Sequence, residues 1–399
     1  MTRGVKYIAY PNASGYGLAG LAYVRALHNA GVPVWWQPWF LWGEPHRWTP
    51  ADGLPRLPLA RAAQAGAGLA DLPALIEACM RPIPYDAIVV HTVPEQFPQF
   101  VESGKRVLGY TVWETDALPA HWPPLLNAVH AVAVPSRFNA EIFAGDGATR
   151  PVHVVPHVRR HAWSAAAPDE AIALRLRLSI PDDHFVFYTI AAWDPRKALE
   201  ELMVTFARTF GPDEPVTLVI KTSTTIASAA QHGGSLVEHH VRRIAEEAAR
   251  RLGRPGANYA LIAADDISAR TIDAIHALGD CYVSFTHGEG WGMGAFDAAT
   301  LGKPVLITGW GGQLDFLGED YPGLIRYRLA PVAGWLPHAS YQSSQRWAEP
   351  DVEHAAALMR GAAAGETGLA QAAERVREII TNRFAEPIVA RQLLAAIDG

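Results

Sequence analysis

No part of this chain constrains its fold more than Ser284–Leu317, which reads SFTHGEGWGMGAFDAATLGKPVLITGWGGQLDFL. The apolar run Cys281–Phe285 predicts a buried strand, and the glycine-spaced turn Gly288–Gly294 leads into a predicted helix. Lys303-Pro304 ends that helix, and the apolar run Val305–Thr308 predicts a second strand. A strand, a helix and a parallel strand in this order form the repeating unit of an α/β fold.

The same segment predicts a binding site for an anionic ligand. Glycines let backbone N–H groups approach a ligand closely, and a helix N-terminus favours an anionic group such as phosphate. Two carboxylates, Glu289 and Asp297, bracket this turn. Such a site has backbone amides that bind a phosphate and carboxylates that accept hydrogen bonds from hydroxyls. A sugar nucleotide carries both kinds of group.

The motif resembles the donor site of the retaining glycosyltransferases of family four (glycosyl transferases group one). The matching residues are Glu289-Gly290-Trp291-Gly292, Asp297-Ala298-Ala299, Gly302-Lys303-Pro304-Val305 and Gly311-Gly312. The resemblance implies that the sugar and diphosphate are bound by Glu289 and by the backbone of Gly290, Trp291, Gly292, Met293 and Gly294. The family usually has Phe at Trp291 and Glu at Asp297, where the carboxylate holds the ribose. Asp297 is one methylene shorter, which implies a looser or water-bridged ribose contact.

Apolar runs and helical stretches alternate along the whole chain, which predicts parallel sheets wrapped by helices. The predicted strands are Val5–Tyr10, Pro33–Gln37, Ala87–His91, Arg106–Thr111, Ala131–Pro135, Val152–Val155, His184–Ala191, Val216–Lys221, Tyr259–Ile262, Cys281–Phe285 and Val305–Thr308. The resemblance implies the GT-B fold: α/β, with two Rossmann-like domains whose parallel sheets face each other across a cleft. We expect residues 1–160 to form an acceptor-side domain and 161–379 a donor-binding domain, with a C-terminal helix at about 380–399 packed back on the first.

Basic residues are expected around the diphosphate, because negative charge grows on it as the glycosidic bond breaks. Arg196 and Lys197 follow the predicted strand His184–Ala191, and Lys221 is the last residue of the predicted strand Val216–Lys221. The family more often has an arginine about five positions before the lysine, where this chain has Ala192. The alternative is that these cations are only solvated.

A glycine loop after the first strand, Asn12–Leu18, resembles the family's N-terminal loop, which places Gly15 beside the donor. The alternative is an ordinary turn capped by Ser14 or Asn12. The family often has a histidine at the end of the strand that His91 ends, where it touches the reacting sugar. His287 lies two residues before Glu289, and we expect it to line the donor pocket. Each histidine has a purely structural alternative.

The acceptor side offers Glu114 and Asp116, in a segment that resembles a signature of some of these transferases. Their carboxylates suit acceptor hydroxyls, or else cap and brace the crevice. Trp35, Trp36, Trp39, Trp42 and Trp48 cluster in one proline-rich stretch. They form either a flap over the acceptor or, as we favour, part of a hydrophobic core.

Composition excludes several other classes of protein. The net charge of −6 argues against a nucleic-acid partner. The two cysteines lack metal-ligand spacing, so we expect buried thiols in a reducing compartment. The N-terminus lacks the apolar core of a signal peptide, and no apolar run is long enough to span a membrane. We expect a cytoplasmic protein, with peripheral membrane contact left open.

No Asp-x-Asp triad, zinc-type His/Cys cluster or GKS/T phosphate loop occurs in the chain. This pattern fits a metal-independent site with no cofactor besides the donor substrate. The resulting hypothesis is transfer of a sugar, most simply a hexose, from a nucleoside-diphosphate sugar to a hydroxyl acceptor with retention, in glycan or glycoconjugate biosynthesis. The acceptor is open among a glycan, a lipid-linked glycan, a protein and a small molecule, and the oligomeric state is not predicted. The alternatives are a sugar-nucleotide epimerase of the same fold and a non-catalytic sugar-nucleotide-binding subunit.

Overall fold

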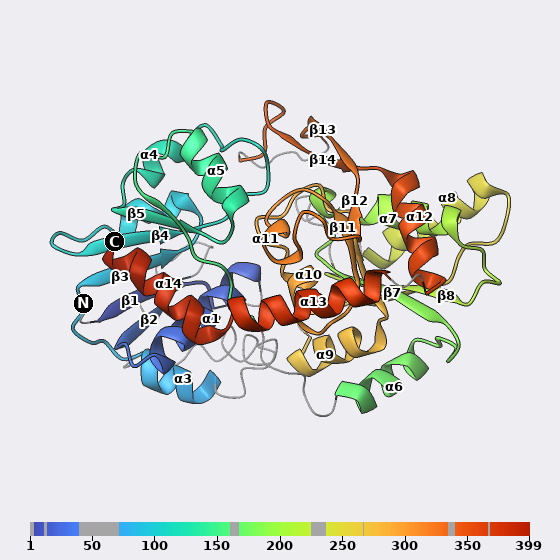
Figure 1. Cartoon of the computed structure of the whole chain (residues 1–399), viewed down its shortest axis with the longest axis horizontal. Coiled ribbons are helices and arrows are strands. Elements are labelled where there is room, and N and C mark those ends of the chain that lie inside the picture. Colours follow the sequence, from blue (N-terminus) through green and yellow to red (C-terminus); the bar gives the residue numbers. More distant parts are fainter. Residues whose placement is uncertain are drawn as a thin grey trace. The chain divides into compact units, whose positions relative to one another are not determined.

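The computed structural model describes residues 4–11, 14–39, 72–159, 167–224, 237–265, 267–333, 340–365 and 368–399. The chain forms two compact units: Met1–His161 with Ile380–Gly399, and Ala162–Ile379. Each unit contains a six-stranded parallel sheet with helices on both faces, which confirms the predicted α/β class (Figure 1). Asn12, Trp42 and Trp48 lie outside the described residues.

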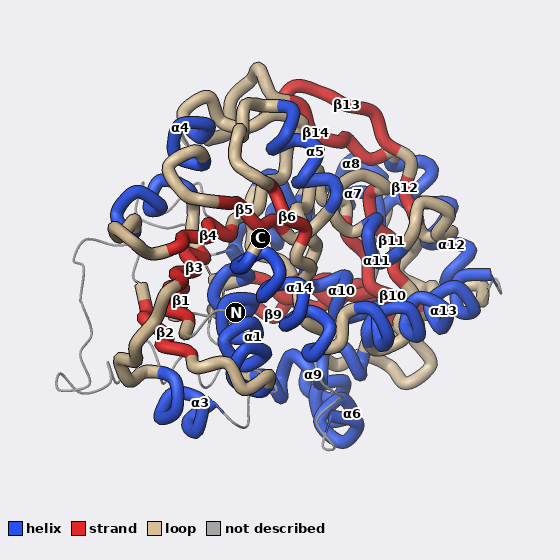
Figure 2. Tube along the Cα trace, turned by 60° about the vertical axis from the view of Figure 1, so that its left-hand side comes forward, coloured by secondary structure: helices blue, strands red, loops and turns tan. Residues whose placement is uncertain are grey.

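The strands of the first unit are β1 (Val5–Ala9), β2 (Val34–Pro38), β3 (Ala87–His91), β4 (Arg106–Tyr110), β5 (Ala131–Val134) and β6 (Val152–Val154). All pairs are parallel, in the order β2-β1-β3-β4-β5-β6, and Figure 2 shows the strands following one another in that order. The strand order reverses between β1 and β3, because the chain passes from β1 to β2 on one side and returns to β3 on the other.

Helices cover both faces of this first sheet. They are α1 (Gly15–Asn29), α3 (Leu72–Cys79), the 3₁₀ helix η2 (Pro94–Phe100), α4 (Trp122–Leu126), α5 (Arg137–Gly145) and α14 (Glu386–Asp398). Side chains of α1, α3 and α14 share one buried apolar cluster with the sheet. A buried ion pair joins α14 to α1, since Arg25 Nε lies 2.7 Å from a Glu386 carboxylate oxygen. On the opposite face Phe97 packs closely on Gly109, where a Cβ atom would lie 2.3 Å from its ring.

The described tryptophans in β2 and directly after it differ in their surroundings. Trp36 is fully buried in the core of the first unit, in agreement with the prediction that we favoured. Trp35 is half-buried against Tyr85, and the ring of Trp39 meets Phe100 edge-on. Both cysteines, Cys79 and Cys281, are buried free thiols, as predicted.

The strands of the second unit are β7 (Phe185–Ile190), β8 (Val216–Thr222), β9 (Tyr259–Ala263), β10 (Cys281–Ser284), β11 (Val305–Thr308) and β12 (Leu324–Ile325). They pair in parallel in the order β12-β11-β10-β7-β8-β9. Every predicted strand of both units matches an observed strand to within one residue at either end. The short β12 was not predicted.

The helices of the second unit are α6 (Ala167–Arg177), the 3₁₀ helix η3 (Pro195–Lys197), α7 (Leu199–Thr209), α8 (Val237–Leu252), α9 (Ala269–Leu278), α10 (Met293–Thr300), α11 (Leu314–Leu317) and α12 (Val352–Ala363), and α13 (Gly368–Arg383) leads into the first unit. Apolar residues of α7, α8 and α12 bury one face of the sheet. On the other face Tyr188 of β7 lies 2.9 Å from Nδ1 of His276 in α9. Tyr282 of β10 packs under Gly294 of α10, where a Cβ atom would lie 2.5 Å from the phenol oxygen.

An antiparallel hairpin, β13 (Tyr327–Pro331) and β14 (Arg346–Pro350), also belongs to the second unit. It was not predicted from the sequence. Most side chains of β13 are exposed, so its sequence lacks the apolar run that identified the core strands. The hairpin is fixed at Ala348, whose backbone N–H donates to the carbonyl of His287 at 2.8 Å.

Candidate functional site

The candidate site lies at the carboxyl ends of β7 and β10, which are neighbours in the second sheet. The strand order reverses between them, because the chain passes from β7 to β8 and β9 and then returns to β10 on the other side. Open α/β sheets bind ligands at such a reversal point. Three segments meet at this edge: the β7 loop (191–198), the β10 loop (285–292) and the β11 loop (309–313).

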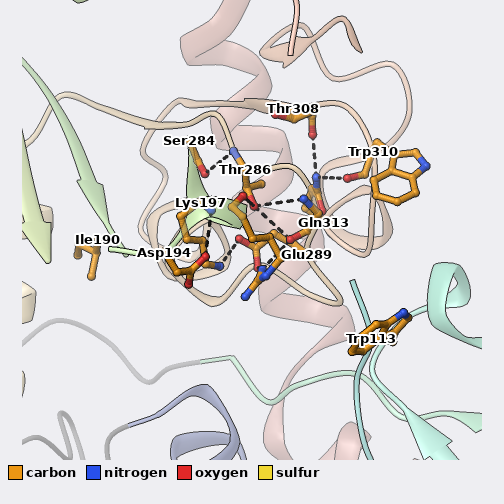
Figure 3. A network of polar contacts seen from close by, with 12 residues as sticks. Trp113, Ile190, Asp194, Lys197, Ser284, Thr286, Glu289, Thr308, Trp310 and Gln313 are labelled. Carbon is orange, nitrogen blue, oxygen red and sulfur yellow. Dashed lines mark hydrogen bonds and ion pairs between the residues drawn. The ribbon is translucent and has the colours of Figure 1, made fainter. Parts of the chain in front are cut away.

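The β7 loop is shaped by η3. Asp194 begins this short helix, because its Oδ1 accepts a hydrogen bond from the backbone N–H of Lys197 at 3.2 Å. Pro195, at the first helical position, has a φ suited to that turn. The turn places the Lys197 side chain toward Glu289 of the β10 loop (Figure 3).

Arg196 ties the β7 loop to the β10 loop. Its carbonyl accepts hydrogen bonds from the backbone N–H of His287 at 2.7 Å and from Oγ1 of Thr286 at 3.3 Å. Its guanidinium Nη1 donates to the carbonyl of Gly288 at 2.7 Å. These contacts run in both directions, so Arg196 fixes the backbone that leads into Glu289.

Glu289 receives both cations of the β7 loop. Lys197 Nζ lies 2.5 Å from Oε1, and Arg196 Nη1 lies 3.5 Å from Oε2. All three side chains are between 13% and 17% exposed. Burial alone would raise the pKa of Glu289, but the charges of Lys197 and Arg196 outweigh it and hold the pKa below its usual value. Glu289 is therefore an ionised carboxylate between two cations, and the three side chains together carry a net positive charge.

The β11 loop holds the opposite side of Glu289. The backbone N–H of Gly312 donates to the carbonyl of Glu289 at 2.8 Å. Gln313 is fully buried, and its Nε2 donates to the carbonyls of Thr308 at 2.7 Å and Trp310 at 2.8 Å (Figure 3). Gly311 has a φ of 124°, and a Cβ atom there would lie 2.7 Å from the Glu289 carbonyl. Only glycine fits this position without distorting the loop.

Helix α10 begins directly after the β10 loop. Gly292 occupies the N-cap with a φ of 87°, and no side chain caps this end of the helix. Met293 and Gly294 form the start of the first turn, and the Glu289 side chain lies beside Gly292. A helix N-terminus carries a partial positive charge, which adds to that of Arg196 and Lys197.

The indole of Trp291 points into the core. It is 2% exposed and packs against Phe296 and Phe316, so only the backbone at this position is suited to contact a ligand. His287 is also buried. Its ring stacks on Trp347 at 4.5 Å, and its Nδ1 lies 2.8 Å from the carbonyl of Ala348. These contacts of His287 connect the hairpin to the β10 loop.

Asp297 lies in α10 and Lys221 at the end of β8. Asp297 is half-buried in the second turn of α10, and Gly290 is buried within the β10 loop. Lys221 is half-buried at the end of β8, where its carbonyl accepts a hydrogen bond from the backbone N–H of Ala191 at 3.1 Å. Of the predicted donor residues, Arg196, Lys197 and Glu289 are in direct contact, and the donor roles of Lys221 and Asp297 stay predictions.

In the first unit, His91 is buried in an aromatic cluster at the reversal between β1 and β3. Its Nδ1 lies 2.9 Å from the hydroxyl of Tyr7, and it is 1% exposed. Burial and the neighbouring charge of His157 lower the pKa of His91 well below its usual value. Tyr23 links the cluster further, with its hydroxyl 3.1 Å from Nδ1 of His157. A contact of His91 with a sugar stays a prediction.

The other predicted residues of the first unit lie in loops. Gly15 is exposed at the start of α1, which Ser14 caps by accepting from the backbone N–H of Gly17 at 3.2 Å. Glu114 and Asp116 are half-buried in the segment after β4. Asn139 holds that segment, because its side chain both donates to the carbonyl of Trp113 and accepts from its backbone N–H. The acceptor roles stay predictions.

Sequence reasoning missed three residues that build the site. Thr286 and Gln313 hold the β10 and β11 loops by hydrogen bonds to backbone carbonyls, and Asp194 caps η3. The Asp-Pro pair at 194–195 carries a recognisable helix-start signal. No comparable signal marks Gln313, because its partners are backbone carbonyls that any residue could supply.

In the part of the chain that the structure describes, no group of three or more His, Cys, Asp or Glu side chains is arranged to hold a metal ion. No helix among the described residues is both long and apolar enough to cross a membrane.

Searches with protein-family models and among curated protein sequences found no match. Solved structures do resemble the chain. The Anabaena protein HepE, crystallised with UDP and glucose, is 15% identical with a TM-score of 0.59 over 100% of both chains. Sucrose-phosphate synthase from Thermosynechococcus elongatus is 16% identical with a TM-score of 0.62 over 99% of this chain and 100% of the other.

A UDP-forming α,α-trehalose-phosphate synthase from Burkholderia xenovorans is 13% identical, with a TM-score of 0.63 over 100% of this chain and 99% of the other. At these identities the likeness concerns the fold. The chain therefore shares the two-sheet α/β architecture, GT-B, of these glycosyltransferases.

Proposed function

We propose that this protein is a glycosyltransferase, which moves a sugar from a nucleoside-diphosphate sugar to a hydroxyl acceptor with retention of the anomeric configuration. The observation that carries the proposal is the Arg196–Glu289–Lys197 ion-pair cluster at the strand-order reversal, beside the N-terminus of α10. Its cationic groups suit a diphosphate, and its carboxylate suits sugar hydroxyls.

The reaction breaks the bond between the anomeric carbon and the diphosphate oxygen, and the bonding electrons stay on that oxygen. Arg196 and Lys197 stabilise the negative charge that grows there, more strongly in the transition state than in the ground state. With retention, the acceptor hydroxyl attacks from the face that the diphosphate leaves, and a phosphate oxygen takes its proton. In this route the protein supplies no covalent nucleophile.

Each remaining donor residue has a separate role. The Glu289 carboxylate and the amides of residues 290–294 bind the donor sugar, and Asp297 accepts hydrogen bonds from the ribose hydroxyls. Lys221 adds positive charge at the same edge of the sheet. His91, Glu114 and Asp116 are proposed for the sugar and acceptor side.

The structural relatives support the choice of donor to test first. One was crystallised with UDP and glucose, and another is described as UDP-forming. UDP-glucose is therefore the first probe, followed by GDP-mannose and ADP-glucose. The proposed context is the synthesis of a glycan or glycoconjugate, with the acceptor still to be found.

Incubation with the radiolabelled donors tests the proposal. Transfer to an added acceptor, or slow hydrolysis of the donor, supports it. Epimerised donor would identify an epimerase, and binding without turnover would identify a binding subunit. Glu289→Ala is expected to lower turnover at least about 100-fold, the usual scale for losing a group that stabilises the transition state. Wild-type turnover in a folded Glu289→Ala variant would contradict the role of Glu289.

A further inference from the structure

The ammonium group of Lys197 has two possible anionic partners in the proposed reaction. In this structure it pairs with Glu289 at 2.5 Å. Arg196 differs, because its guanidinium is also anchored to the carbonyl of Gly288 at 2.7 Å. The backbone of Lys197 is fixed by Asp194, so the flexible four-carbon side chain is the part that can turn from one anion to another.

The exchange has a cost at Glu289. This carboxylate is 13% exposed and Lys197 is its closest cation, so turning Lys197 toward a diphosphate removes its shortest ion pair and leaves Arg196 at 3.5 Å and the hydroxyl of Thr286. The diphosphate also places a second anion near the carboxylate. An underpaired buried carboxylate is unfavourable unless other donors replace the lost one.

Sugar hydroxyls are such donors. We propose that Glu289 makes the site discriminate between the nucleoside-diphosphate sugar and the bare nucleoside diphosphate, by exchanging Lys197 for sugar hydroxyls. With the sugar present, Lys197 donates to the diphosphate while sugar hydroxyls donate to Glu289, so both anions are satisfied. With the bare diphosphate, Glu289 and the phosphate compete for the same ammonium group. This inference rests on the proposed function and adds a specificity role to it.

The same competition assists product release. After transfer the sugar has left, its hydroxyls no longer reach Glu289, and the carboxylate takes Lys197 back. The product diphosphate then loses one of its cations and dissociates more readily than the donor. The ion pair seen in the structure is the state to which the site returns.

Isothermal titration tests this with UDP and UDP-glucose as probes, or with GDP and GDP-mannose or ADP and ADP-glucose if these bind instead. Two dissociation constants are measured, one for the nucleoside diphosphate and one for the nucleoside-diphosphate sugar, and the ratio of the first to the second is calculated. The ratio is compared between the wild type and Glu289→Gln, a substitution that keeps the shape of the side chain and removes its charge. We expect the ratio to fall about tenfold in Glu289→Gln, which corresponds to about 1.4 kcal/mol. Most of this change should come from tighter binding of the diphosphate.

The control is Glu353→Gln, the same substitution in an exposed ion pair with Arg208 in the same unit. Its ratio should equal that of the wild type. Lys197→Met is a second variant, for which we expect the ratio to change in the opposite direction. It keeps the Glu289 charge and removes the cation that Glu289 shares with the diphosphate. Glu289 then depends more on hydrogen bonds from the sugar hydroxyls, so the ratio should rise.

An unchanged ratio in both site variants, or weaker diphosphate binding in Glu289→Gln, overturns the inference but leaves the proposed function standing. Failure of the wild type to bind any of the three diphosphates or their sugars overturns the proposed function, and the inference with it.

Discussion

Lys197 and Glu289, 92 positions apart in the chain, form an ion pair of 2.5 Å that links the β7 loop to the β10 loop. The contact exists because β7 and β10 are adjacent in the sheet, although η3, α7, β8, α8, β9 and α9 lie between them along the chain. It joins the two loops that leave the point where the strand order reverses.

Removing only the cation should destabilise the protein more than replacing both partners. Lys197→Met leaves the Glu289 carboxylate in a largely buried place, and we expect a loss of about 2 kcal/mol in the free energy of unfolding. The double variant Lys197→Met/Glu289→Leu removes both charges and should recover most of that loss. Urea unfolding of the two variants and the wild type provides the comparison, and equal losses would show that the unpaired Glu289 carboxylate does not destabilise the folded protein.

Gly311→Ala should disturb the site strongly. Its φ of 124° is unfavourable for alanine, and the new Cβ would meet the Glu289 carbonyl, so we expect a loss of about 3 kcal/mol. Gly365→Ala is the matched control, because its φ is 74° but nothing lies within 4 Å of the new Cβ. That control should cost about 1 kcal/mol and leave donor binding unchanged. Similar losses in the two variants would show that crowding against Glu289 is unimportant.

Gln313→Ala should loosen the β11 loop. The carbonyls of Thr308 and Trp310 lose their common donor, and we expect a loss of about 2 kcal/mol together with weaker nucleotide-sugar binding. Gln371→Ala, on the exposed side of α13, should change stability by less than about 0.5 kcal/mol. Thermal unfolding and titration of both variants check this, and a Gln313→Ala protein with wild-type affinity would remove Gln313 from the site.

The buried histidines of the first unit should make stability fall in mild acid. Burial lowers the pKa of His157 from 6.5 to about 3. As the pH falls below 6.5 the unfolded chain binds a proton at His157 and the folded chain does not, so this contribution to stability is present above 6.5 and lost as pH falls toward 3.

Each such group contributes up to about 1.4 kcal/mol per pH unit. Between pH 7 and pH 5 the wild type should therefore lose about 2 kcal/mol more than His157→Gln, whose amide keeps a polar group near the hydroxyl of Tyr23. Urea unfolding at the two pH values gives both differences. Parallel losses in the two proteins would mean that His157 titrates normally in the folded state.

The core strands could be predicted because buried strands consist of consecutive apolar residues, which the sequence shows directly. Ala87–His91 and Val305–Thr308 are apolar runs of strand length, and the structure buries them completely. The β13–β14 hairpin escaped prediction because it is largely exposed on β13, where Tyr327, Arg328 and Leu329 give no regular pattern. Its position depends on the contacts of Trp347 and Ala348 with His287, which only the folded chain shows.

The site was predictable in its residue types but not in its contacts. The glycine spacing located the β10 loop and the start of α10, and the basic pair Arg196-Lys197 located the β7 loop. The sequence could not show that Glu289 accepts from both cations, since that depends on the order of the strands. It also could not show that the Trp291 indole packs in the core beside Phe296 and Phe316; the expected backbone contact of Trp291 with the donor stays a prediction.

A crystal structure of the protein with the nucleoside-diphosphate sugar that most raises its thermal stability tests the central claim most directly. We predict that the diphosphate oxygens lie within hydrogen-bond distance of Lys197 Nζ and the Arg196 guanidinium, beside the first turn of α10, with sugar hydroxyls on Glu289. A diphosphate bound away from the carboxyl ends of β7 and β10 would contradict the account.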